Sequence, residues 1–192
     1  MVAVRTLRSA IRKRRANLLP AEVGARSARI SALLWKLPQM ARSRRIACYV
    51  AVAGEVDCGP IMQEALDRHR QVYLPLLHGK SLMFARWDPA GAMAANRFGI
   101  PEPTAPRRSW ISARDLDVVL TPLVAFDSAG HRLGMGGGFY DRALAFTSSR
   151  GNWRHPWIIG VGYAFQQVDA LPARDWDVGL HGAVTEIEPH LF

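Results

Sequence analysis

The residues best suited to chemistry lie in the segment 134–138, which reads Gly-Met-Gly-Gly-Gly directly before a predicted helix. Glycine allows positive φ and leaves backbone N–H groups exposed, and such groups at a helix N-terminus bind anions. The spacing is not that of a Walker A loop, which needs a Lys-Ser/Thr pair. Nor is it Gly-x-Gly-x-x-Gly, because Phe139 stands where the third glycine belongs. By itself the cluster is a weak signal that a flexible turn would also explain.

Two charged residues flank the glycine cluster. Asp141 falls in the first turn of the predicted helix, where the helix dipole favours a carboxylate and where it could reach a Mg²⁺ that bridges phosphates. Arg132 precedes the cluster and carries a guanidinium that can bind two phosphate oxygens at once. An ordinary helix-start carboxylate is the alternative for Asp141. Together these residues indicate a candidate site for phosphate groups.

The elements that must position these residues alternate between strand and helix. Short apolar segments rich in β-forming residues predict buried strands over residues 45–53, 71–77, 81–87, 117–125, 157–162 and 183–186. Apolar residues at helical spacing predict helices over residues 3–19, 20–37, 60–69 and from the glycine cluster to about residue 146. This alternation predicts an α/β fold with a mainly parallel sheet, in a single domain over residues 1–192.

Prolines and loops divide these elements. Pro122 must end its strand, because proline cannot donate a hydrogen bond to a central ladder. Pro38 is expected to end the second helix, since proline disrupts a helix interior. Residues 88–106 are expected to form a loop.

Length and composition exclude several classes of protein. At 192 residues and 49% hydrophobic positions, the chain is long enough for one sizeable core and is not a disordered or fibrous chain. The longest apolar runs reach about half of the roughly 20 residues that span a bilayer, and the N-terminus has no signal-peptide pattern. We therefore expect a cytoplasmic protein without a membrane partner. Cys48 and Cys58 have neither metal-ligand spacing nor a disulfide framework and are expected to be free thiols.

The net charge of +9 comes from one part of the chain. The first 45 residues hold 12 Lys and Arg against one acidic residue, whereas the rest of the chain is nearly neutral. The basic runs Arg12-Lys13-Arg14-Arg15 and Arg42 to Arg45 fit solvated helix faces. The alternatives are a surface for nucleic acid or one that attracts a polyanionic small substrate.

The segment Arg132-Leu-Gly-Met-Gly-Gly-Gly-Phe-Tyr-Asp-Arg142 resembles the signature of the 5-formyltetrahydrofolate cyclo-ligases, also called 5,10-methenyltetrahydrofolate synthetases. Pro122-Leu-Val-Ala-Phe-Asp127 and a turn ending at Gly130 precede it, as in that family. Further family elements follow in order, namely Leu7-Arg8, Glu55, Leu74-Pro75, Gly99-Ile-Pro-Glu-Pro103, Gln166, Leu171-Pro172 and Asp175. The resemblance covers residues from about 4 to 186.

This resemblance implies an enzyme of folate one-carbon metabolism. Such an enzyme converts 5-formyltetrahydrofolate to 5,10-methenyltetrahydrofolate through an N5-iminium phosphate, depends on ATP and Mg²⁺, and releases ADP and phosphate. The family has a Rossmann-like three-layer α/β domain, on which we expect the basic N-terminal helices to pack. ATP is the co-substrate and Mg²⁺ the cofactor that the resemblance implies.

The resemblance also implies roles for single residues. Arg132 and Asp141 are implied as catalytic, and Asp141 and Asp175 as ligands of the metal. ATP contacts are implied for Val4, Arg5, Thr6, Leu7, Arg8, Arg132, Leu133, Gly134, Met135, Gly136, Gly137, Gly138, Phe139 and Tyr140. Folate contacts are implied for Val50, Glu55, Met135, Gly136, Gly137, Gly138 and Phe139. Because Val4, Met135 and Gly137 replace basic residues of some relatives, Arg132, Arg8 and the metal have more phosphate charge to neutralise.

Elementary chemistry agrees with some of these roles. A carboxylate such as Glu55 can accept two parallel N–H bonds, which suits the amidine edge of a pterin. The basic helices would attract ATP and a folate with a polyglutamate tail, since both are polyanions. Phe98 could line an apolar slot for the folate rings together with Met83 and Phe84, although core packing explains each of these positions better. We expect a monomer or a weak dimer.

Two other functions compete with this one. An RNA-binding protein would explain the basic first 45 residues, but it leaves the glycine cluster, Asp141 and Asp175 unused. It also lacks aromatic residues interleaved with the arginines, so a nucleic-acid partner is disfavoured. A relative of the sugar-phosphate isomerases or CoA-transferases would share a similar sheet, but the continuous match over Arg132–Arg142 favours the folate enzyme.

Overall fold

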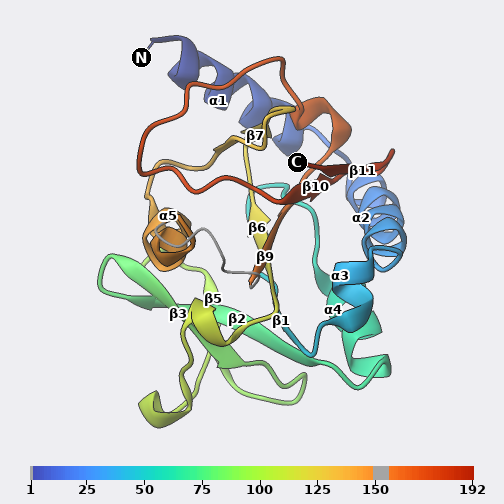
Figure 1. Ribbon diagram of the computed structural model, residues 1–192. Coiled ribbons are helices and arrows are strands. Elements are labelled where there is room, and N and C mark those ends of the chain that lie inside the picture. Colours follow the sequence, from blue (N-terminus) through green and yellow to red (C-terminus); the bar gives the residue numbers. More distant parts are fainter. Residues whose placement is uncertain (1, 149–155) are drawn as a thin grey trace.

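The computed structural model describes residues 2–148 and 156–192. Within them a seven-stranded sheet is formed by β1 (Arg45–Ala47), β2 (Gln71–His78), β3 (Ser81–Arg86), β6 (Val118–Pro122), β9 (Trp157–Val161), β10 (Gly182–Val184) and β11 (Pro189–Leu191). Its order is β11-β10-β9-β6-β1-β2-β3 (Figure 1). The strands from β10 to β2 pair in parallel, and the edge strands β11 and β3 pair antiparallel. The predicted α/β class with a mainly parallel sheet is confirmed.

Helices cover this sheet on both faces. They are α1 (Val2–Ala16), α2 (Pro20–Leu34), α3 (Pro38–Arg42), α4 (Gly59–Asp67) and α5 (Phe139–Leu144). Alternate strand residues point to opposite faces. Thus Ile46 and Val118 belong to the apolar cluster under α2 to α4, whereas Ala47 and Val119 belong to the cluster that includes Leu144 of α5. Figure 1 shows α2, α3 and α4 on one side of the sheet and α5 on the other.

The basic helices pack on the sheet through their few apolar residues. In α2, Ile30 and Leu34 are fully buried in the cluster that covers β1 and β6. In α1, Ile11 packs against Val124 and Leu171, at the end of the sheet where Figure 1 shows α1 crossing. Both helices thereby bury one face and leave most basic residues on the other, as amphipathic helices do.

Several helix and strand boundaries differ from the sequence predictions, and two of these differences have a clear physical cause. The run 45–53 forms a strand only over Arg45–Ala47, because the chain then leaves the sheet for a turn at Ala53 and Gly54, both with positive φ. Pro38 does not simply end a helix. It is the first residue of α3, where proline is tolerated because the N–H groups of the first helical turn have no hydrogen-bond partner within the helix.

Two pairs of strands were not predicted. Residues 88–106 were expected to be a loop, yet they contain a hairpin of β4 (Met93–Ala95) and β5 (Pro101–Pro103). Two prolines and a short alanine-rich strand hide the usual alternation of a hairpin. A second small sheet joins β7 (Ala125–Phe126) to β8 (Arg132–Leu133), and the C-terminal β11 also lies beyond the last predicted strand.

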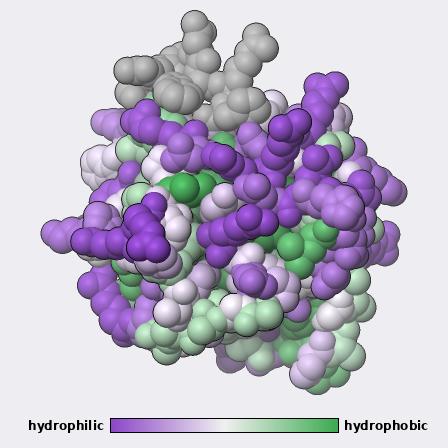
Figure 2. Space-filling model, turned by 90° about the horizontal axis from the view of Figure 1, so that it is seen from below, coloured by the Kyte–Doolittle hydropathy of each residue, from purple (hydrophilic) through white to green (hydrophobic). Residues whose placement is uncertain are grey.

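Because most apolar residues are buried in the core, the surface is expected to be mainly polar. Figure 2 shows a mostly hydrophilic face with hydrophobic residues in several separate areas. No helix in the described ranges is long and apolar enough to cross a membrane. Cys48 and Cys58 are both buried free thiols, as predicted.

Candidate active site

A cavity of about 610 Å³ opens where the glycine segment meets α1, the β4–β5 hairpin and residues 171–177. Its size is that of a small-molecule site. Its lining includes two groups of residues: the segment 132–142, which carries the charged side chains of Arg132, Asp141 and Arg142, and a second group with Val50, Glu55, Pro75, Leu77 and Leu82. We call the first group the phosphate end and the second group the folate end, after the roles that the resemblance implies for Arg132 and for Glu55.

The glycine segment has a backbone that other residues rarely adopt. Gly136 has a φ of 96° and Gly138, the N-cap of α5, has a φ of 63°. A Cβ at Gly138 would also lie 2.7 Å from an Nη1 atom of Arg142. Because L-residues are strained at such φ values, the exposed backbone of this segment depends on glycine.

Arg132 and Asp141 form the charged centre of the phosphate end. Arg132 lies on β8 and Asp141 on α5, and a guanidinium Nη2 of Arg132 donates to Oδ1 of Asp141. The same carboxylate oxygen accepts the backbone N–H of Val178 at 3.3 Å. The Arg132 side chain is only 5% exposed, and its Nη1 has no hydrogen-bond partner within the described residues. The buried guanidinium of Arg132 therefore has an N–H donor, at Nη1, that no other described residue uses and that could bind a ligand in the cavity.

Helix α1 brings two of its five predicted contact residues to the cavity. Val4 and Arg8 line it, and Nε of Arg8 donates to the backbone oxygen of Gly134 at 3.0 Å. Arg5 and Thr6 are exposed, and Leu7 packs against the cluster around Ile11. Residues four apart share a helix face, so Val4 and Arg8 can reach the cavity while the residues between them cannot.

Glu55 lies buried at the folate end, next to Val50. Its side chain is 7% exposed, Oε2 accepts the backbone N–H of Val52 at 3.2 Å, and Oε1 accepts a bond from Arg15 at 3.4 Å. Burial raises the pKa of the Glu55 carboxyl, and Arg15 and the Val52 amide oppose this rise. Both Glu55 and Val50 line the cavity, as the resemblance implies for substrate contacts.

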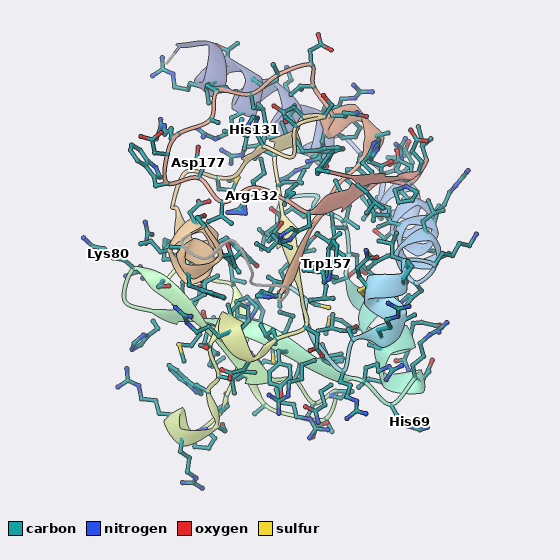
Figure 3. All side chains as sticks on the ribbon, viewed as in Figure 1. His69, Lys80, His131, Arg132, Trp157 and Asp177 are labelled. Carbon is teal, nitrogen blue, oxygen red and sulfur yellow. The ribbon has the colours of Figure 1, made fainter. Side chains whose placement is uncertain are left out.

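The two predicted metal carboxylates lie in different surroundings. Asp141 lines the cavity, whereas Asp175 is exposed and is not part of the lining. Asp177 lines the cavity instead, and Figure 3 labels it together with Arg132. In the part of the chain that the structure describes, no three His, Cys, Asp or Glu side chains form a group that could hold a metal ion. Asp141 is thus the predicted ligand that the fold brings to the cavity.

Comparison with known proteins identifies the family of this chain. The sequence model of the 5-formyltetrahydrofolate cyclo-ligase family matches residues 1–186. The 5-formyltetrahydrofolate cyclo-ligase of Haemophilus influenzae is 38% identical over 179 residues, which cover 91% of this chain and 92% of that protein. The chain belongs to the 5-formyltetrahydrofolate cyclo-ligase family. It is also 37% identical to the Escherichia coli K12 cyclo-ligase over 180 residues, which cover 91% of this chain and 96% of the relative.

The fold of this cyclo-ligase family member is also similar to a solved structure. The NMR structure of Aquifex aeolicus 5,10-methenyltetrahydrofolate synthetase superimposes with a TM-score of 0.82 and 32% sequence identity, covering 98% of this chain and 92% of that one. These findings confirm the resemblance predicted from Arg132–Arg142. They favour an enzyme over the RNA-binding interpretation of the basic helices.

Arg15 does not lie on the solvated helix face that its basic run predicts. It is 1% exposed. An Nη1 of Arg15 donates to Glu55 and also to the backbone oxygen of Leu123 at 3.3 Å. The spacing of Val4, Arg8, Ile11 and Arg15 places them on one face of α1, and this spacing was the available signal.

The β4–β5 hairpin adds Asn96, Phe98 and Glu102 to the cavity lining. Glu102 accepts bonds from the backbone N–H of Leu77 at 2.9 Å and from Nδ2 of Asn96 at 2.7 Å, which ties the hairpin to β2. Phe98 lines the cavity, and its ring meets that of Phe139 edge-on at 5.9 Å. Of the three residues suggested for an apolar slot only Phe98 lies here, since Phe84 is in the core and Met83 is outside the lining.

Proposed function

We propose that this protein converts 5-formyltetrahydrofolate to 5,10-methenyltetrahydrofolate, using ATP and releasing ADP and phosphate. The observation that carries the proposal is a single cavity lined by both Arg132 and Glu55. The Nη1 of Arg132 has no hydrogen-bond partner within the described residues, and the Glu55 carboxylate is buried. The names of the relatives in H. influenzae, E. coli and A. aeolicus support the same reaction.

At the phosphate end, this chain supplies positive charge and backbone donors. Arg132 would bind phosphoryl oxygens through Nη1, while its Nη2 stays on Asp141 and keeps the guanidinium in place. Arg8 lies against Gly134 and adds a second guanidinium. The glycine segment lets a phosphate approach the backbone closely, because no Cβ stands in the way. Such groups act chiefly by aligning the phosphates and neutralising their charge.

Mg²⁺ fits this end as an ion bound by few protein ligands. Such ions commonly take one or two carboxylates and complete their shell with phosphates and water, which agrees with a cavity that offers Asp141 but no three-residue cluster in the described ranges. When bound, Mg²⁺ would neutralise phosphate charge during transfer. We propose Asp141 as its carboxylate, and the role of Asp175 stays a prediction.

At the folate end, a carboxylate meets an apolar wall. Glu55 would accept the paired N–H groups of the pterin, because a carboxylate accepts two such bonds side by side. Leu77, Leu82 and Phe98 line the cavity and would pack on the flat rings. This arrangement would turn the N5-formyl group toward the phosphate end.

The reaction then needs alignment more than a protein nucleophile. The formyl oxygen attacks the γ-phosphorus of ATP and ADP leaves, which gives the N5-iminium phosphate. N10 attacks the iminium carbon, loses its proton and expels phosphate, and the ring closes. The first step joins an atom of the folate to an atom of ATP, and the second joins two atoms of the folate, so holding the reacting groups in line accounts for much of the expected acceleration.

The exposed part of the basic surface has a role in capture. Arg5, Arg12, Lys13 and Arg14 are exposed on α1, close along the helix to Arg8. Their charge would attract ATP and a polyglutamylated folate, and salt would weaken this attraction.

The test is to mix the purified protein with 5-formyltetrahydrofolate, ATP and Mg²⁺ and to follow the near-ultraviolet absorbance of the methenyl product. We expect product only when all three are present. Product without ATP, or no product under any condition, would overturn the proposal.

A further inference from the structure

Arg15 is a buried cation with few hydrogen bonds. Only its Nη1 is bonded, with distances of 3.4 Å to Glu55 and 3.3 Å to the Leu123 oxygen. Its Nε and Nη2 are buried without a hydrogen-bond partner within the described residues. Burying a guanidinium is costly when its donors stay unpaired, and a buried ion pair is weak evidence of stabilisation. The contact of Arg15 with Glu55 therefore says more about the role of Arg15 than any contribution to stability does.

The backbone of Arg15 also contacts the turn that carries Glu55. Gly54 has a φ of 73°, and a Cβ there would lie 2.7 Å from the backbone oxygen of Arg15. Within the same turn, the N–H of Glu55 donates to the oxygen of Val52, and the N–H of Val52 donates back to the Glu55 carboxylate. The end of α1 thus packs on this turn through both its backbone and the Arg15 side chain.

Helix α1 reaches both ends of the cavity with one face. Arg8 contacts Gly134 at the phosphate end, and Arg15 contacts Glu55 at the folate end. Seven residues separate them, which is about 10 Å along a helix. Arg8 lines the cavity itself, whereas Arg15 lies behind Glu55 and outside the lining.

We infer that Arg15 is a positioning residue for the folate substrate, because it holds the Glu55 carboxylate ionised and fixed in the cavity wall. This inference rests on the proposed function, since it concerns how Glu55 binds the pterin. Arg15 acts through Glu55 and does not touch the substrate.

The other titratable groups near Glu55 cannot replace Arg15. The phenols of Tyr49, next to β1, and Tyr140, on α5, interact electrostatically with Glu55. Burial raises the pKa of both phenols well above the ordinary tyrosine value, so both are neutral at physiological pH. Arg15 is the cation that opposes the effect of burial on Glu55. Removing it should raise the pH at which Glu55 ionises.

The experiment compares Arg15→Met and Arg15→Gln with Arg15→Lys, which keeps the positive charge. Arg12→Met is the matched control, an exposed residue on the same helix. Steady-state KM values for 5-formyltetrahydrofolate and for ATP are measured over a range of pH, because removal of Arg15 should raise the pH at which Glu55 ionises. Circular dichroism and thermal melting identify the variants that fold.

We expect the neutral variants to raise the KM for folate about tenfold at neutral pH, as the loss of one charge-assisted contact would. The KM for ATP should stay unchanged, and raising the pH should recover folate binding. Arg15→Lys should return the pH dependence toward that of the wild type. In a Glu55→Gln background, Arg15→Met should have no further effect on the KM for folate. Arg12→Met should cause only the mild, salt-dependent change expected for an exposed charge of the capture surface, similar for both substrates and without a new pH dependence.

Two results would overturn the inference. One is a folded neutral variant with the wild-type KM for folate. The other is a parallel rise of both KM values that Arg15→Lys does not relieve, as a purely structural role would give. The wild type is assayed first, so that a lack of turnover there counts against the proposed function and not against Arg15. If Arg15→Met fails to fold, Arg15→Gln decides the question.

Discussion

The two ends of the cavity are built in different ways. The phosphate end comes mostly from the contiguous residues 132–142, with Arg8 added from α1. At the folate end, Glu55 is held by Arg15, which lies outside the lining and also donates to the Leu123 oxygen, and these three residues are distant in the sequence and buried in the fold. The charged side chains of the phosphate end are close in the sequence, so the local backbone conformation is enough to bring them together. At the folate end, a buried carboxylate needs a cation that only tertiary packing can bring to it.

The largest loss of turnover is expected from a substitution at the phosphate end. Asp141→Asn keeps the shape of the side chain but removes the charge that holds Arg132 and that would hold Mg²⁺. We expect kcat to fall by about 10²- to 10³-fold, the usual cost of losing one electrostatic contact in a transition state. The measurement is steady-state turnover across a Mg²⁺ titration, with thermal melting to confirm the fold.

Asp175→Asn is the matched comparison for Asp141→Asn. Asp175 is exposed and lies outside the cavity lining, so we expect a much smaller loss of turnover. A loss as large as that of Asp141→Asn, with the same change in Mg²⁺ dependence, would make Asp175 a metal ligand. Equal, wild-type rates in both variants would remove the metal assignment altogether.

The next prediction distinguishes the role of Arg8 from that of Arg15, both of which lie on α1. Arg8→Ala removes the guanidinium at Gly134, and we expect the KM for ATP to rise about tenfold with little change in the KM for folate. This is the reverse of the pattern expected for Arg15. The control is the double change Arg12→Ala and Lys13→Ala on the exposed face of α1, which should show mild, salt-dependent effects only. Equal effects of Arg8→Ala and the control would refute a specific role for Arg8.

These comparisons show what the sequence could predict. The segment Arg132–Arg142 carries its chemistry in consecutive residues, so its glycines and charges are visible without a structure. Arg15 stands in a run of four basic residues, and its burial depends on the positions of Glu55 and Leu123. The β4–β5 hairpin was missed for a similar reason, since Glu102 ties it to β2 through a contact across 25 residues. Local patterns predict elements and motifs, whereas buried polar pairing depends on the complete fold.

A change in the turn beneath α1 should have a moderate effect. In Gly54→Ala, the methyl group would meet the Arg15 backbone at a position of positive φ, which we expect to cost about 1 to 2 kcal/mol of unfolding free energy. The displaced turn should also raise the KM for folate and leave the KM for ATP unchanged. Urea unfolding and both KM values check this. Gly79→Ala is the control, because it shares positive φ and lies in open space. If both variants lose equal stability and keep both KM values, contact with Arg15 has no special importance.

The smallest expected effect concerns His181, which lies outside the cavity lining and influences how stability changes with pH. The backbone N–H of Ile158 donates to Nδ1 of His181 at 2.9 Å, and burial lowers the pKa of that imidazole below its ordinary value. The folded state therefore favours the neutral ring. Its contribution to stability is complete above the unfolded pKa of about 6.5 and is lost as the pH falls through the lower pKa of the folded state. Urea midpoints should decline over this range, and His181→Asn, whose Oδ1 can still accept the Ile158 bond, should flatten the decline. An unchanged slope in His181→Asn would assign the decline to other groups. In either case the KM for folate should keep its own pH dependence, because that dependence belongs to Glu55 and Arg15.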